Sequence, residues 1–134
     1  MLIPRIKRAD PDKVFIICKN DEAATTMVDG DVVKYTVAAS KNYGVDVILG
    51  TAVVVNAGVV SGRDVKVGDY GLIQVYGYHS NVKGTGTLAT SATCIPGSAN
   101  NITDGAAGDD PSLRMGIVLK ALASGRVGVF LKCM

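Results

Sequence analysis

Apolar and polar residues alternate along much of the chain, most clearly in its middle. In GLIQVYGYHSNV at 71–82, successive residues fall on opposite faces, and a period of two is typical of a β-strand. Gly68 and Gly71 flank Asp69 and Tyr70, and glycines provide the backbone freedom that a turn needs. The stretch 65–82 therefore predicts two strands joined by a turn at 68–71.

Other apolar runs, separated by turn residues, predict further strands. The run VFIIC at 14–18 is apolar throughout and partly β-branched, which is typical of a strand buried on both faces. Gly, Asp, Asn and Ser punctuate the chain between such runs. The remaining predicted strands lie at 25–37 (a hairpin about Asp29-Gly30), 45–60 (one bent strand or two short ones), 87–95, and 114–133 (a hairpin that turns at 123–126).

Seven to nine short strands without intervening helical patterns predict an all-β fold, either a small antiparallel β-barrel or a β-sandwich. Residues 14–134 are expected to form a single β domain. Residues 96–110, PGSANNITDGAAGDD, have too little apolar surface to pack strongly, so they predict a long, exposed Gly/Asn/Asp loop.

Residues 1–13 read differently from the rest of the chain. Apolar residues alternate loosely with basic ones, and Pro4 and Pro11 are incompatible with a regular helix. Two interpretations stay open: a frayed terminus, or an extended arm that lies on a partner with its apolar residues as anchors. The residues in question are Leu2, Ile3, Arg5, Ile6, Lys7 and Arg8.

Composition narrows the possible partners. The 134 residues carry a net charge of +2, include no tryptophan, and are only 5% aromatic, which argues against a nucleic-acid surface. Charged residues make up 19%, below the usual quarter or so, which fits either a surface partly covered by a partner or a neutral soluble surface made of Gly, Ser, Thr and Asn. No apolar run reaches the ~18 residues of a membrane span, and the start lacks a signal-peptide core. We therefore expect no membrane partner and synthesis in the cytoplasm.

Candidate chemistry is sparse. His79 is followed by Ser80, but neighbouring side chains on a strand point to opposite faces, so a surface or subunit-contact histidine is expected. The acidic residues near 104–110 lack the spacing of a calcium loop. Cys18, Cys94 and Cys133 fit no zinc spacing and are expected to be reduced and mostly buried. The sequence predicts no enzyme, no cofactor and no metal.

Tyrosines form the one aromatic concentration, because Tyr76 and Tyr78 share a face of the predicted strand. Ordinary packing on the sheet is one interpretation. A protein–protein contact is the other, since tyrosine is enriched at interfaces.

Two parts of the sequence resemble capsid decoration (cement) proteins of tailed bacteriophages: GLIQVYGYHSNV at 71–82, with the Gly/Thr/Ala-rich sequence after it to Ser98, and RMGIVLKALASGRVGVFLKCM at 114–134. Those proteins often carry a strand of the form x-V-Q-V-x-G, a variable Gly/Ala loop and a closing hairpin. The resemblance covers residues 65–134, and the first 60 residues contain no matching motif. The closing pattern stands here as Gly116, Leu119, Ala121, Ala123, Gly125, Val127, Val129, Phe130 and Leu131.

The resemblance implies a structural virion protein that binds and stabilises the outer surface of an assembled phage capsid. It implies the major capsid protein as partner, homotrimers at local three-fold positions, and a place on the capsid exterior. The alternatives are another virion component, such as a head fibre or tail protein, and a small β-barrel that binds carbohydrate or oligonucleotide. If the chain is a decoration protein, the arm residues named above and the loop at 96–110 are expected to contact the capsid. The predicted subunit interface consists of Tyr76, Tyr78 and Phe130.

Overall fold

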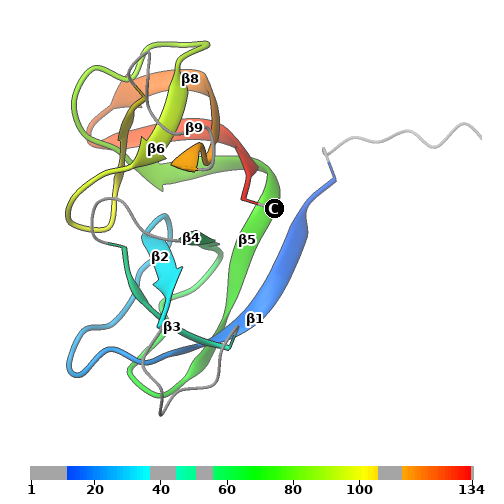
Figure 1. The fold of residues 1–134 in the computed structure, drawn as a ribbon, viewed down its shortest axis with the longest axis vertical. Coiled ribbons are helices and arrows are strands. Elements are labelled where there is room, and N and C mark those ends of the chain that lie inside the picture. The colour runs from blue at the N-terminus through cyan, green and yellow to red at the C-terminus, as the bar shows by residue number, and fades with distance from the viewer. Residues whose placement is uncertain (1–11, 37–44, 51–55, 106–112, 134) are drawn as a thin grey trace, which may run out of the picture.

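The computed structural model describes residues 12–36, 45–50, 56–105 and 113–133. The described residues form nine β-strands and confirm the all-β prediction (Figure 1). The strands are β1 (Val14–Asn20), β2 (Val32–Tyr35), β3 (Asp46–Leu49), β4 (Asn56–Val60), β5 (Tyr70–Lys83), β6 (Thr93–Pro96), β7 (Ile102–Asp104), β8 (Gly116–Ala123) and β9 (Arg126–Lys132).

Five of the strands close into a barrel. They pair in the order β1-β3-β2-β4-β5, and β5 also pairs with β1, which completes the ring. All contacts in the ring are antiparallel except β1 with β3, which are parallel through Lys19↔Asp46 and Asn20↔Val47. The barrel is therefore mixed. Closure gives every strand of the ring two neighbours, so most of the backbone polar groups in the ring find partners.

The other four strands continue from the far half of β5 in the order β9-β8-β6-β7. A parallel bridge between Gly84 and Ile102 brings β7 back beside the end of β5, and Thr85 N–H donates to Ile102 O at 2.9 Å. Figure 1 shows β5 running from the lower group of strands into the upper group. This 14-residue strand thus belongs to both groups.

Two apolar cores lie on opposite faces of β2 and β4. Adjacent residues of β2, Val32 and Val33, are both fully buried but belong to different cores, as do Val59 and Val60 of β4. Alternation along a strand places them on opposite faces. One core consists of Val32, Val59, Val82, Leu88, Cys94, Ile102, Met115, Val118, Val127, Val129 and Leu131; the other of Cys18, Met27, Val33, Val47, Ala57, Val60, Val65 and Ile73.

The prediction that the run at 14–18 is buried on both faces is wrong. Cys18 is buried, but Phe15 is 40% exposed and Ile17 is 65% exposed. The strand exists as predicted, yet β1 lies on the barrel wall with only one face against the core.

Two predicted hairpins take other partners. Residues 25–28 do not pair with β2; Met27 instead bridges Val65, and β2 lies between β3 and β4. The first limb of the hairpin predicted at 65–82 is reduced to that bridge, whereas the second limb is β5. Long-range pairing therefore prevailed over the local turns at both places.

The remaining elements follow the sequence more closely. The closing hairpin is confirmed as β8 and β9, and residues 45–60 contain two short strands, β3 and β4. Of 87–95, only the last three residues lie in a strand, β6. The expected loop at 96–110 contains β7, because Ile102 is fully buried in the core and the strand pairs with β6. Residues 106–112 lie outside the described residues.

Candidate functional site

Large apolar side chains are exposed side by side on β1 and β5. Ile17 lies opposite Leu72 in the strand pairing, and the two side chains are 65% and 46% exposed. Opposed residues of antiparallel strands point to the same face, so these side chains share one outer surface. We call this surface the β1–β5 face. It consists of Val14, Phe15, Ile17, Tyr70 and Leu72.

The β1–β5 face is hollowed at its centre. A shallow pocket of about 320 Å³ is lined by Ile17, Arg63, Tyr70, Gly71 and Leu72. The guanidinium of Arg63 donates to Tyr70 O at 3.2 Å, which holds this cation beside the apolar floor. A hollow with apolar walls and a cation at its rim suits the insertion of an apolar side chain from a partner.

A second and smaller apolar patch lies on β8. Ile117 and Leu119 are 48% and 51% exposed. Both side chains point away from the core, which Val118 between them enters instead. We call this pair the β8 patch.

The predicted subunit interface is brought together by the fold. Tyr78 lies opposite Phe130 on β9, and the rings of Tyr76 and Phe130 meet edge to face with centroids 5.2 Å apart. All three side chains are half-buried and packed within the chain. The aromatic residues thus make ordinary sheet contacts, and their role between subunits stays a prediction. The predicted capsid-binding residues Leu2, Ile3, Arg5, Ile6, Lys7 and Arg8 lie outside the described residues.

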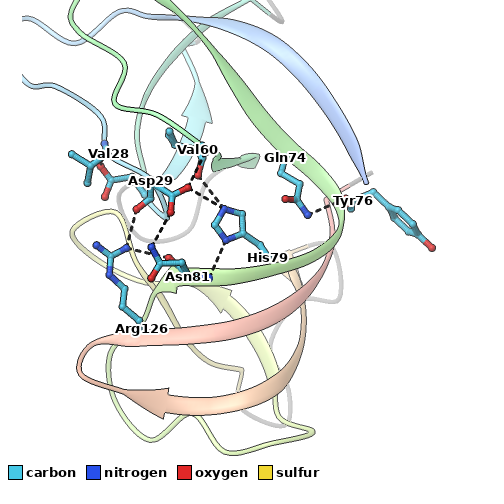
Figure 2. Close-up of polar contacts among 10 residues, drawn as sticks. Val28, Asp29, Val60, Gln74, Tyr76, His79, Asn81 and Arg126 are labelled. Carbon is cyan, nitrogen blue, oxygen red and sulfur yellow. Dashed lines mark hydrogen bonds and ion pairs between the residues drawn. The ribbon is translucent and has the colours of Figure 1, made fainter. Parts of the chain in front are cut away.

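A partly buried polar cluster lies where the turn before β2 meets β5 and β9 (Figure 2). Asp29 accepts hydrogen bonds from Asn81 Nδ2 at 2.8 Å and from Gly62 N–H at 2.9 Å. Arg126 Nη1 donates to Asp29 O at 2.9 Å and to Asn81 O at 3.1 Å. The cluster therefore ties the turn at 28–31 to both groups of strands.

His79 belongs to this cluster, and the prediction that it lies at the surface is wrong. Its side chain is 5% exposed. Asn81 N–H donates to Nδ1 at 3.2 Å, and Nε2 lies 3.2 Å from Val60 O and 3.6 Å from Asp29 Oδ1. This pattern assigns the proton to Nε2, because Nδ1 already accepts a hydrogen bond. A second proton would break the bond from Asn81.

Electrostatics in the cluster oppose protonation of both acid–base groups. Burial lowers the pKa of His79, as do Lys13 and Arg126, and these effects exceed the opposing ones of Asp29 and Val60 O. Burial alone would raise the pKa of Asp29. Four groups lower it by more than that: the hydrogen bonds from Asn81 and Gly62, and the charges of His79 and Arg126.

Stability is therefore expected to fall at acid pH. A folded pKa below the unfolded value of about 6.5 means that the unfolded chain binds a proton first, so stability present above that pH is lost as the pH falls through 6.5. Asp29 adds a second loss below about pH 4 for the same reason. In denaturant titrations between pH 7 and pH 5, the free energy of unfolding should fall by up to about 1.4 kcal/mol for each pH unit below 6.5 because of His79.

The control for this prediction is His79→Gln, because a glutamine amide can still donate to Val60 O but does not titrate. The variant should be less stable at pH 7 and should show a flatter dependence between pH 7 and pH 5. An unchanged slope in this variant would assign the acid sensitivity to other groups.

Reactive groups are few in the described part of the chain. Burial raises the pKa of Cys18 to about 11 and those of Cys94 and Cys133 to about 12, so these thiols are protonated and inert near neutral pH. No group of three His, Cys, Asp or Glu side chains within the described ranges could hold a metal ion. Among these residues, no helix is long and apolar enough to cross a membrane.

Comparison with known proteins rests on structure, because no family model and no curated protein sequence matches the chain. The N-terminal base of the head fiber protein gp8.5 of bacteriophage phi29 superposes with a TM-score of 0.60 at 14% identity. The superposition covers 91% of this chain and 96% of that chain. The two chains share a fold.

Proposed function

We propose that the chain is a structural protein of a phage virion that attaches to the capsid exterior in the manner of a head fibre base. The observation that carries the proposal is the likeness to the gp8.5 base, which extends over nearly the whole of both chains. Of the roles predicted from the sequence, this likeness favours the head fibre over the decoration protein. Both roles place the chain on the outside of the head and require no catalysis.

The physical character of the domain supports this role. The strands form a closed barrel and a second packed group that share β5, which makes a stiff body. Two apolar surfaces, the β1–β5 face and the β8 patch, are available for contacts with other proteins. Because a capsid presents many equivalent sites, each contact can be weak and still hold several linked copies.

In this proposal the arm makes the contact with the major capsid protein. Its apolar residues would anchor in the shell, and Arg5, Lys7 and Arg8 would meet acidic groups there. Several copies, predicted as a trimer, would place several arms on one site.

Sedimentation with capsids tests the proposal. Purified chain is mixed with heads of the source phage that lack it, and the bound fraction is measured after pelleting. We expect saturable binding that the triple variant Arg5→Glu, Lys7→Glu, Arg8→Glu weakens at least about tenfold, since charge reversal at an interface costs several kcal/mol.

The matched control is Lys120→Glu, which reverses an exposed charge on β8 in the body of the domain. It should bind as the unchanged chain does. Binding that survives the triple variant would remove the arm from the proposal, and a chain that stays in the supernatant with heads of its own phage would overturn the function itself.

A further inference from the structure

From the structure we infer that the β1–β5 face is the surface through which copies of this chain associate, in place of the aromatic residues Tyr76, Tyr78 and Phe130. The inference takes one premise from the proposed function, namely that several copies of the chain assemble.

Exposure separates the two candidate surfaces. The aromatic residues are half-buried and already packed against one another, with Tyr76 and Phe130 in an edge-to-face contact. Ile17 and Leu72, by contrast, leave about half or more of each side chain in water. Burial of side chains that are still exposed yields a larger gain on association than burial of side chains already packed.

The area of the face matches one side of a protein–protein interface. The apolar residues of the face are 40% to 65% exposed, which leaves on the order of 400 Å² of them in water, within the range for the largest patch on a monomer. A standard interface buries about 800 Å² per partner, and a little over half of that is apolar. The face therefore supplies the apolar share of one such interface, whereas the two residues of the β8 patch do not.

Charge at the rim favours a second copy over a strongly acidic or basic partner. The turn that borders the pocket carries exposed residues of both signs, with Arg63 and Lys66 beside Asp64 and Asp69. A rim of mixed sign can be complementary to another copy of itself, while a partner of one charge would meet repulsion from half of these groups.

The position of the face also suits the proposed capsid contact. Val14 belongs to the face and begins β1, so it directly follows the arm at 1–13. Copies joined through this face would begin their arms at the interface between them, which would bring several arms to one site on the capsid.

The test is the mass of the full chain in solution, measured by light scattering or sedimentation over a range of concentrations. We expect an oligomer for the unchanged chain, whose single-chain mass is 13.9 kDa. Ile17→Asp and Leu72→Arg should each weaken self-association at least about 100-fold, as charge at the centre of an interface does. Both side chains point outward, so both variants should keep the circular dichroism spectrum of the folded chain, while the melting temperature falls only by the share that self-association contributes.

Leu119→Asp is the matched control, because it introduces the same charge at a side chain of similar exposure, 51%, on the β8 patch. It should leave the mass unchanged. The inference fails if the unchanged chain is a monomer at all concentrations, or if the control dissociates the oligomer as strongly as Ile17→Asp does.

Capsid binding by the same variants separates this inference from the proposed function. A monomer that pellets with heads overturns the self-association surface but leaves the function standing. An oligomer that dissociates on Ile17→Asp, yet never pellets with heads, supports the surface and overturns the function.

Discussion

Gly30→Ala is expected to lower the free energy of unfolding by about 3 kcal/mol or more. Gly30 has a φ of +87°, and a Cβ atom there would lie 2.0 Å from Asn81 O and 2.4 Å from Arg126 Nη1. Backbone strain in this region costs about 1–3 kcal/mol, and the overlap with a backbone oxygen adds to it. Thermal unfolding should show the loss as a fall of about 10 °C or more in the melting temperature.

The close contact arises because the turn before β2 packs directly on β5. Gly30 N–H donates to Val60 O at 2.9 Å, and Gly30 O accepts from Lys83 N–H at 2.9 Å. The turn is thus held from both sides, and neither it nor β5 can retreat from an added methyl group without breaking these bonds.

Gly68→Ala is the control for this prediction. Gly68 has a similar φ of +81°, but nothing lies within 4 Å of the position of its Cβ. It should therefore show only the conformational cost, about 1 kcal/mol. Equal losses in the two variants would mean that the packing of the turn on β5 contributes nothing.

Most of the strands could be predicted from the sequence, and β5 shows why. Its alternation was strong enough to fix both the element and its faces, and His79 falls on the same face as Ile73 and Val75, which are buried. The same alternation is the signal that could have shown His79 to be buried. We expected a surface or subunit-contact residue instead, and that expectation was wrong because Val60 O and the Asn81 N–H satisfy both ring nitrogens inside the fold.

The exposure of β1 could not be predicted from its residues. An unbroken apolar run looks the same whether two layers cover it or one, and only the pairing of the strands decides between them. β7 shows the converse, since one buried residue, Ile102, and pairing with β6 suffice for a strand in a polar segment. Both depend on contacts between residues far apart in the chain.

The candidate site was predictable only in part for the same reason. The aromatic residues were recognisable because two of them lie at i and i+2 of one strand. The β1–β5 face was not, because Ile17 and Leu72 are 55 positions apart and meet only through the pairing of β1 with β5.

Asp31→Ala is expected to cost about 3 kcal/mol of unfolding free energy, since it removes the acceptor of a buried network. The carboxylate is 1% exposed. It accepts from Val28 N–H at 2.8 Å and from Asn100 Nδ2 at 2.6 Å, and it forms an ion pair with Lys83. The variant leaves these donors without their partner, and each unsatisfied buried group costs about 1–3 kcal/mol.

The effect should be large because Asp31 joins the two groups of strands. Asn100 lies in the turn between β6 and β7, and its backbone N–H and C=O bond to Gly50 and Val32 of the barrel side. Lys83 ends β5 and is 31% exposed, so water can solvate part of its charge once Asp31 is gone. This access to water sets the expected loss below the upper end of the range for a fully buried pair.

Denaturant unfolding of Asp31→Ala, Lys83→Met and the double variant measures the network. The coupling between the two sites should exceed about 1 kcal/mol, because the single variants remove the same ion pair. Asp64→Ala, at an exposed aspartate, should stay within about 0.5 kcal/mol of the unchanged chain. If Asp31→Ala were equally mild, the Asp31 carboxylate would contribute little to holding the two groups of strands together.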